Sequence, residues 1–274
     1  MFGNGSDELI QLLALAAGGQ DSFLLAPEPS FSMYRIIAAM VGMRYHGVSL
    51  REDFSLDPLA MASAIEVYRP ALTFIAYPNN PTGNLFDAEQ VREIISSSPG
   101  LVVVDEAYFA FTERTFVHEI ADYPNLLVLR TFSKLGLAGL RLGYLIGARS
   151  LLGELEKLRL PYNVNTLSQL TAEFALLHAE VIESQAAILR AQRCRLEQGL
   201  GSFPTLRVFP SEANFILFRV SPGRAGAVFE GLKANGILIK NLDAPGTPLA
   251  DTLRVSVGTP DENERFLAVL TSLV

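Results

Sequence analysis

Cysteine and histidine are scarce in this sequence of 274 residues, which contains one of the former and three of the latter. The single cysteine, Cys194, excludes an intramolecular disulfide and a cysteine-rich metal site. The histidines show no metal-ligand spacing, so we interpret them as structural or surface residues and predict no metal centre; they are His46, His118 and His178.

Long apolar runs and a targeting segment are missing as well. No apolar run is long enough to span a bilayer, and the first residues lack the basic region and the cleavage site of a secretory signal. We therefore expect a cytoplasmic protein with no membrane partner.

Positive charge is in deficit, because 22 lysines and arginines face 29 acidic residues and give a net charge of −7. This balance argues against a nucleic-acid partner, although it is compatible with a local basic pocket for a small anion. Hydrophobic residues make up 49% of the chain, enough for the core of one large domain or of a large and a small one. A mean hydropathy of +0.27 is high for a monomer and favours a buried subunit interface.

The first part of the chain alternates between apolar runs and amphipathic stretches. Runs that are apolar on both faces are typical of parallel strands covered by helices on both sides, so we predict an α/β domain with a mostly parallel central sheet. Asp87 and Gln90 have the spacing of a helix capping box. We expect helices over 8–18, 31–42 and 87–98, and strands over 23–26, 72–77, 101–108, 126–132 and 141–147.

The pattern changes near residue 167. Residues 168–200 indicate one or two long helices, and short strands and two further helices follow them. We therefore predict a large α/β domain over 1–167 and a smaller α+β domain over 168–274, joined by a long helix.

Polar side chains stand where several predicted strands end. Asn80 follows the strand 72–77, Asp105 and Tyr108 lie at the end of the next one, and Lys134 follows the strand 126–132. Because ligands bind at the carboxyl ends of the strands in an open α/β sheet, we expect these side chains to meet at one edge. The turn "GNGSDE" opens the first helix, whose free N–H groups favour an anion.

These groups together suit a cofactor with a phosphate, a cationic ring nitrogen, a ring hydroxyl and an aldehyde, and pyridoxal phosphate has all four. Asp105 follows three valines, so desolvation would raise its pKa unless a cation stands beside it. Each piece by itself is weak, since an aspartate after a valine run is more often a strand-end acid.

Six segments in chain order strengthen the interpretation: "YPNNPTGNLF", "VVVDEAYFAF", "RTFSKLGLAGLRLGY", "PYNVNTLSQ", "EANFILFRV" and "LRVSVGTPDENERFL". The sequence resembles the class-II, fold-type-I family of pyridoxal-phosphate-dependent aminotransferases. Within that family it is most similar to the histidinol-phosphate aminotransferases. The resemblance covers nearly the whole chain.

The resemblance implies a role for each matching residue around the cofactor ring. Lys134 in "FSK" would bond to the cofactor aldehyde and later move a proton at the substrate's Cα. Asp105 would pair with the ring nitrogen, while Tyr108 and Asn80 would bond to the ring hydroxyl. Phe31 would stack on the ring face.

The resemblance also implies a phosphate cradle. Ser6 and Asp7 would offer backbone N–H groups, and Ser133 and Arg141 would complete the cradle, with Thr131 as a weaker candidate.

Three further residues are implied in the substrate pocket. Arg254 matches the arginine that grips the substrate carboxylate in a forked geometry. Lys240 stands where the family usually has arginine, so it would hold a substrate phosphate as a point charge. Asn163 in "PYNVN" is the third pocket residue.

The activity implied is amino-group transfer from L-histidinol phosphate to 2-oxoglutarate in histidine biosynthesis, giving imidazole acetol phosphate and L-glutamate, by a homodimer. Another aminotransferase, such as an aromatic one, or a phosphothreonine decarboxylase shares much of the motif set. A third alternative is an inactive remnant that serves as a binding subunit.

The start of the chain departs from the family, whose members carry a substantial lead-in before "GNGSDE", whereas two residues precede Gly3 here. The lead-in normally supplies a tyrosine to the neighbouring subunit's cofactor phosphate. For the chain as given we therefore expect weak cofactor retention and slow or no turnover.

Overall fold

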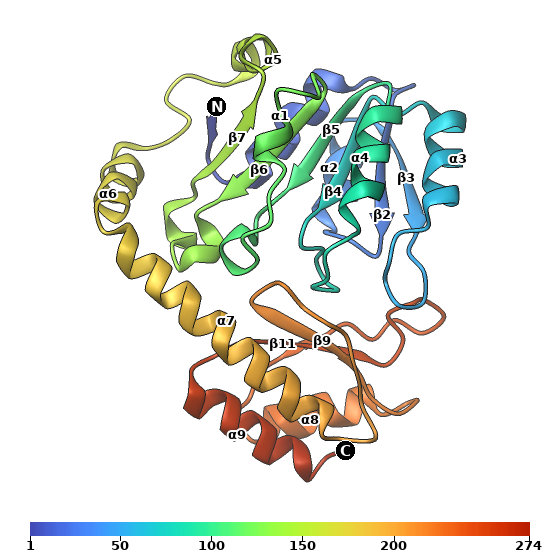
Figure 1. Ribbon diagram of the computed structural model, residues 1–274, viewed down its shortest axis with the longest axis vertical. Coiled ribbons are helices and arrows are strands. Elements are labelled where there is room, and N and C mark those ends of the chain that lie inside the picture. Colours follow the sequence, from blue (N-terminus) through green and yellow to red (C-terminus); the bar gives the residue numbers. More distant parts are fainter.

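The computed structural model describes residues 1–274, which form two β-sheets with helices packed around each (Figure 1). The larger sheet has seven strands in the order β1-β7-β6-β5-β4-β2-β3. Its strands are β1 (Phe2–Gly3), β2 (Phe23–Glu28), β3 (Arg44–Ser49), β4 (Leu72–Ala76), β5 (Leu101–Asp105), β6 (Leu126–Thr131) and β7 (Gly143–Gly147).

The predicted α/β fold with a mostly parallel sheet is confirmed. Strands β2 to β6 all run parallel, while β7 pairs antiparallel with β6, and β1 pairs antiparallel with β7. The reason lies in the connection: only two short 3₁₀ turns, Ser133–Leu135 and Ala138–Leu140, separate β6 from β7. A parallel return needs a crossover of a dozen or more residues, usually with a helix, so this short connection folds back.

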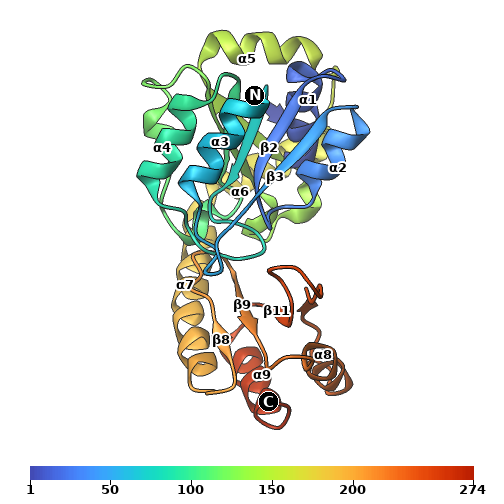
Figure 2. The same cartoon turned by 90° about the vertical axis from the view of Figure 1, so that its right-hand side faces the viewer.

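Helices cover both faces of this sheet (Figure 2). Val102 and Val104 of β5 pack in one core cluster, and Val103 packs in the other, which explains why this strand is apolar from Leu101 to Val104. The first cluster includes residues of α3 and α4, and the second includes residues of α1, α2 and α5. The helices are α1 (Ser6–Ala17), α2 (Met33–Met40), α3 (Pro58–Tyr68), α4 (Ala88–Ser97) and α5 (Arg149–Leu155).

Four of these elements, β1, β3, α3 and α5, were not predicted. Strand β3 forms the sheet edge, and its sequence RYHGVS lacks the apolar run of the inner strands. Helix α3 does carry a start signal, since Asp57 accepts hydrogen bonds from the N–H groups of Leu59 and Ala60 and Pro58 follows it. The predicted cap of α4 is present, because the Asp87 side chain accepts from the Gln90 N–H.

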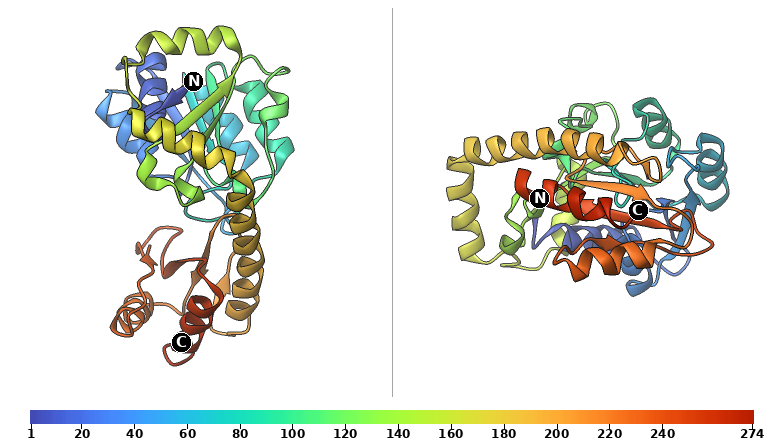
Figure 3. Two further views of the ribbon diagram at one scale, coloured as in Figure 1. Left: turned by 90° about the vertical axis from the view of Figure 1, so that its left-hand side faces the viewer. Right: turned by 90° about the horizontal axis from the view of Figure 1, so that it is seen from below.

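The smaller sheet has the order β10-β11-β9-β8 and is antiparallel throughout. The predicted helical stretch 168–200 is two helices that meet at an angle at His178 (Figure 3). The strands are β8 (Arg207–Val208), β9 (Phe215–Arg219), β10 (Lys240–Asn241) and β11 (Thr252–Ser256), and the helices are α6 (Thr166–Leu177), α7 (Ala179–Gly201), α8 (Ala225–Ala234) and α9 (Pro260–Thr271).

Helix α7 runs from the larger sheet to the smaller one (Figure 1). Its Arg193 is buried, and the guanidinium donates to the carbonyl oxygens of Phe111 and Ala213 and to the Glu212 carboxylate. One side chain thus joins the loop after β5 to the segment before β9. No helix of the chain is both long and apolar enough to cross a membrane.

Candidate active site

A cavity of about 110 Å³ lies where β4, β5 and β6 end and α1 begins. All ten residues expected to hold the cofactor line it, although they come from five separate segments of the chain. The lining residues are Ser6, Asp7, Phe31, Tyr34, Ala76, Pro78, Asn80, Asp105, Ala107, Tyr108, Thr131, Ser133, Lys134 and Arg141.

Asp105 is the buried acid of this cavity. Its Oδ2 accepts a hydrogen bond from the Tyr34 hydroxyl at 2.7 Å, and its Oδ1 accepts one from the Ala107 N–H at 3.0 Å. Burial raises the pKa of Asp105 to about 6, and the two hydrogen bonds oppose that rise. The carboxylate has donors but no ion-pair partner within the chain, so a cation placed beside it would be stabilised.

Lys134 stands in the 3₁₀ turn that directly follows β6. Its Nζ lies 5.3 Å from the centre of the Tyr108 ring. Burial lowers the pKa of the Lys134 amine, and the charge of Asp105 acts in the opposite direction. A lower pKa increases the neutral fraction of the amine, which is the form that attacks a carbonyl carbon.

The opposite end of the cavity suits an anion. Helix α1 begins at Ser6 without a side-chain cap, so its first N–H groups are available, and Gly5 before it has a φ of 87°. The Arg141 Nη2 lies 3.2 Å from Asp7 Oδ2 and packs so closely on Gly5 that an added Cβ would lie 2.7 Å from it. Thr131 and Ser133 bond to each other at 3.1 Å beside this end.

These residues fit pyridoxal phosphate. The buried carboxylate without a cationic partner matches a ring nitrogen, the amine matches an aldehyde, and the uncapped helix with a guanidinium matches a phosphate. Phe31 and Tyr108 add aromatic surface to the lining of the cavity. Burial raises the pKa of Tyr108 to about 12, so its hydroxyl stays protonated and can donate a hydrogen bond.

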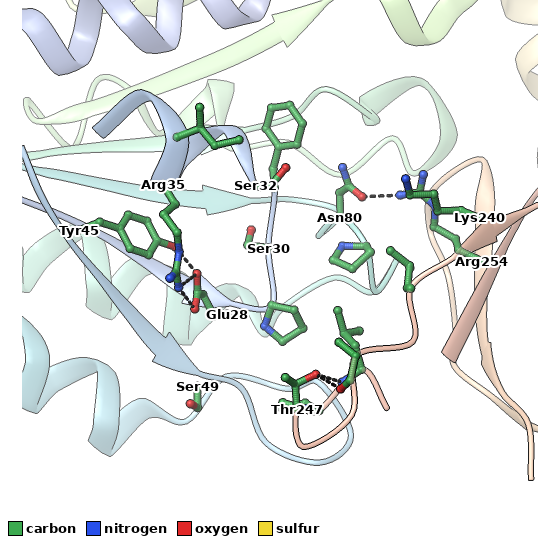
Figure 4. A pocket seen from close by; sticks show the side chains of 18 residues that line it. Glu28, Ser30, Ser32, Arg35, Tyr45, Ser49, Asn80, Lys240, Thr247 and Arg254 are labelled. Carbon is green, nitrogen blue, oxygen red and sulfur yellow. Dashed lines mark hydrogen bonds and ion pairs between the residues drawn. The ribbon is translucent and has the colours of Figure 1, made fainter. Parts of the chain in front are cut away.

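A second, larger cavity of about 660 Å³ opens beside the first and shares Phe31 and Asn80 with it (Figure 4). One side carries Lys240 and Arg254, which come from the smaller sheet. The Arg254 Nη1 donates to Asn80 Oδ1, and its guanidinium lies 4.5 Å from the centre of the Phe215 ring.

The other side of the larger cavity carries a separate polar cluster (Figure 4). Arg35 Nη2 contacts both carboxylate oxygens of Glu28 at 2.6 Å, and the Tyr45 hydroxyl donates to the same carboxylate at 2.9 Å. One wall of the cavity therefore carries the cations Lys240 and Arg254. The facing wall carries Arg35 and Glu28, whose charges cancel each other.

The sequence profile described as "Aminotransferase class I and II" matches residues 1–270. The chain belongs to this aminotransferase family. The expected resemblance to histidinol-phosphate aminotransferases is confirmed by a relative from Nitrosococcus oceani, histidinol-phosphate aminotransferase 2, at 55% identity. The alignment covers 98% of this aminotransferase and 75% of that relative.

Solved structures agree on the fold. The crystal structure of the histidinol-phosphate aminotransferase from Clostridium acetobutylicum superposes with a TM-score of 0.90 at 25% identity, covering 99% of this aminotransferase and 82% of that chain. The histidinol-phosphate aminotransferase from Sinorhizobium meliloti, solved in complex with pyridoxal-5'-phosphate, superposes with a TM-score of 0.88 at 24% identity. The match covers 100% of this aminotransferase and 77% of that chain. At that identity the second match supports the fold alone.

Asn163 is not where a substrate-pocket residue was expected. In the aminotransferase it lines a different cavity, next to Phe2, and its Nδ2 donates to Glu8 Oε2 at 2.7 Å while its Oδ1 accepts from Arg159. The amide is occupied by these partners at the start of α1, so it stabilises the chain before α6 and does not face Lys240 or Arg254. Within one chain the structure therefore places Asn163 outside the cavity that Lys240 and Arg254 line.

Tyr34 is the residue of the cavity that the sequence interpretation missed. It lies three positions after Phe31 in "PSFSMY", and this spacing places both rings on one side of the start of α2. The two rings meet edge-on with centroids 5.5 Å apart. The spacing of three residues between Phe31 and Tyr34 is therefore the signal by which the sequence could have placed Tyr34 in the cavity.

Proposed function

We propose that this aminotransferase binds pyridoxal phosphate and transfers the amino group of L-histidinol phosphate to 2-oxoglutarate, as a cytoplasmic homodimer. The products are imidazole acetol phosphate and L-glutamate. The observation that carries the proposal is the single cavity in which an amine, a buried carboxylate and an anion cradle meet. The name of the relative that is 55% identical supports the choice of substrate.

The residues that hold the cofactor divide into three groups. The N–H groups at the start of α1, with Ser133, Thr131 and Arg141, bind the phosphate. Asp105 pairs with the ring nitrogen, Asn80 and Tyr108 face the ring hydroxyl, and Phe31 covers one face of the ring. The list of proposed cofactor residues is Ser6, Asp7, Phe31, Asn80, Asp105, Tyr108, Thr131, Ser133, Lys134 and Arg141.

The cofactor supplies an aldehyde that bonds to amines and a cationic ring that stabilises negative charge at the substrate's Cα. The chain supplies the proton transfer. Lys134 Nζ, whose pKa burial lowers, would take up and release the proton at the substrate's Cα as a general base. Asp105 keeps its negative charge beside the ring nitrogen, and the aromatic rings of Phe31 and Tyr108 exclude water from the reacting atoms.

The substrate's anionic groups bind in the larger cavity. Arg254 presents a guanidinium that can grip a carboxylate through two N–H groups, and Lys240 presents a single ammonium. Both amino donors of the proposed reaction, histidinol phosphate and glutamate, carry an anionic group at a distance from the reacting amine. Both can therefore use the same pair of cations.

Exposed apolar side chains support the homodimer. Helix α6 and the residues next to it expose several of these side chains. A group of exposed apolar side chains is typical of a protein–protein interface. A second copy packed on this surface would remove them from water. They include Tyr162 at 96% exposure, Leu167 at 76%, Phe174 at 63% and Leu177 at 74%.

The decisive experiment is an absorbance titration of purified protein with pyridoxal phosphate, followed by separate additions of L-histidinol phosphate, L-glutamate and L-phenylalanine. We expect saturable binding, and spectral conversion by histidinol phosphate and glutamate. Conversion by phenylalanine in preference to histidinol phosphate would assign an aromatic amino donor instead. Release of carbon dioxide from phosphothreonine would assign a decarboxylase, and a lack of any binding would contradict the proposed function.

A further inference from the structure

Tyr34 is a buried tyrosine whose ring and hydroxyl both have defined partners. Its side chain is fully buried, its ring stacks on Phe74 with centroids 4.5 Å apart and planes 11° from parallel, and the Phe31 ring meets it edge-on. The ring is therefore fixed from two sides. Its one polar atom points at the cofactor cavity and donates to Asp105 Oδ2 at 2.7 Å.

The direction of this hydrogen bond is settled by burial. Burial raises the pKa of Tyr34 well above its ordinary value, so the phenol remains protonated and acts as the donor. Because the pKa of Asp105 is about 6, the acceptor above this pH is the ionised carboxylate. Because a charge-assisted hydrogen bond is stronger than a neutral one, this contact favours the ionised form of the acid.

Asp105 is held at two points. The Ala107 N–H bonds to Oδ1, and the Tyr34 hydroxyl bonds to Oδ2. A carboxylate with one donor on each oxygen cannot rotate without breaking a bond, and this carboxylate lines the cofactor cavity. The donor to Oδ1 is the backbone N–H of Ala107, so it does not depend on a side chain. The bond to Oδ2 depends on the Tyr34 side chain alone.

We propose that the Tyr34 hydroxyl is a positioning residue that keeps Asp105 ionised and turned toward the ring nitrogen of the cofactor. The inference rests on the proposed function, since it assigns Asp105 to that nitrogen. Tyr34 does not react itself. It acts through Asp105, which must stay anionic for the ring nitrogen to stay protonated and for the ring to accept negative charge.

The test is Tyr34→Phe, which removes one oxygen and keeps the ring between Phe31 and Phe74. In the protein saturated with pyridoxal phosphate we expect kcat to fall about tenfold or more while KM for the amino donor changes less than about twofold. We expect the acidic limb of the kcat profile to move up by about one pH unit, because Asp105 loses the donor that opposes its protonation. The absorbance of the bound cofactor should show the same upward shift.

Tyr77→Phe is the matched control. Tyr77 is also a buried tyrosine of the larger sheet, but it packs in the core on the opposite face. Removing the Tyr77 hydroxyl should leave the pH dependence of the bound cofactor's absorbance unchanged. A Tyr34→Phe protein whose kcat and pH profile both match the parent's would overturn the proposal, whereas absence of cofactor binding in the parent would instead contradict the proposed function.

A double-mutant cycle covers the case in which Tyr34→Phe is merely destabilised. In the Asp105→Asn background there is no carboxylate to keep ionised, so adding Tyr34→Phe should change the cofactor spectrum and kcat by less than about twofold. Equal effects in the two backgrounds would show that Tyr34 acts through packing alone, and the proposal would be wrong.

Discussion

Lys240 and Arg254 lie directly opposite each other on the antiparallel strands β10 and β11. The two side chains therefore leave the smaller sheet on the same face and reach the same cavity. They differ in surroundings: Lys240 is exposed, whereas Arg254 is half-buried and bonded to Asn80 next to the cofactor cavity. Arg254 therefore lies next to the cofactor cavity, whereas Lys240 lies toward the solvent.

The first prediction follows from that asymmetry. Lys240→Ala should reduce kcat/KM for histidinol phosphate by about tenfold and for glutamate by less than about threefold, because a phosphate dianion gains more from a second cation than a carboxylate does. Single-turnover kinetics with each donor would measure both effects. Lys233→Ala, on an exposed lysine of α8, is the control and should change neither. Equal losses for both donors would contradict the assignment.

The second prediction concerns the pH dependence of stability in cofactor-free protein. Because burial raises the pKa of Asp105 from 3.8 to about 6, ionising it in the folded state costs on the order of 3 kcal/mol. The stability gained from the protonated acid is fully present below pH 3.8 and is lost as the pH rises through 6. Tm should therefore fall over this window in the parent relative to Asp105→Asn.

The control for that series is Asp21→Asn, an exposed acid paired with Arg44. Its Tm should follow the parent's across the whole window. Adding pyridoxal phosphate should remove most of the difference between the parent and Asp105→Asn above pH 6, because the ring nitrogen then supplies the missing cation. A parent whose Tm does not fall relative to Asp105→Asn would show that Asp105 is not desolvated.

The third prediction concerns the close approach of Gly5 to Arg141. Gly5→Ala places a Cβ 2.7 Å from the guanidinium and also forces an alanine to a φ of 87°. We expect a loss of about 1 kcal/mol of folding free energy from the backbone and, in addition, cofactor binding weakened by about tenfold or more. Spectroscopic titration with pyridoxal phosphate and thermal unfolding would separate the two effects.

Gly223→Ala is matched to that variant. Gly223 has a φ of 75° and no atom within 4 Å of the added Cβ, so it carries the backbone strain without the clash. Its stability should drop to a similar extent, and its cofactor affinity should not change. If both variants bind the cofactor as the parent does, Arg141 does not hold the phosphate.

The fourth prediction identifies the lysine that bonds to the cofactor. Borohydride treatment of the protein with bound pyridoxal phosphate should leave a pyridoxyl label on Lys134, because its amine is half-buried beside Asp105 and has a lowered pKa. Peptide mapping by mass spectrometry would locate the label. Lys157 and Lys233 are exposed and ion-paired, and a stoichiometric label on either of them would contradict the assignment.

The fifth prediction concerns self-association. Phe174→Glu places a charge among the exposed apolar side chains of α6 and should weaken the homodimer by at least about tenfold, since the charge would have to be desolvated at the interface. Sedimentation velocity over a concentration series would measure this change. Leu59→Glu, at an exposed position on α3, is the control and should sediment as the parent does.

Much of the cofactor cavity follows from the sequence because parallel strands place their carboxyl ends at one edge. Asp105 and Lys134 follow adjacent strands β5 and β6, so topology alone brings them together. Tyr34 was missed because its contact with Asp105 depends on how α2 is turned against the sheet. The pairing of Lys240 with Arg254 depends on strand register, which the 10 residues of loop between β10 and β11, 242–251, do not specify.

The position of Asn163 was not evident from the sequence for a different reason. The segment "PYNVN" matches the family pattern, but its position in space depends on where the chain between α5 and α6 lies, and no periodicity constrains that loop. The Asn163 side-chain amide forms its hydrogen bonds with Glu8 and Arg159. A residue in an irregular segment is thus harder to place than one at the end of a strand.

The bonds of Arg193 have a mechanical consequence. Phe111 and Ala213, which it joins, belong to the same small cluster as Tyr108 and Phe215, so the two halves of the chain meet at a fixed point behind the cofactor cavity. A second contact joins the same halves, because the rings of Phe54 and Phe209 lie 4.7 Å apart. Leu242 and Leu249 of the smaller sheet's rim pack against the core of the larger sheet, so the wall that carries Lys240 is anchored to both halves.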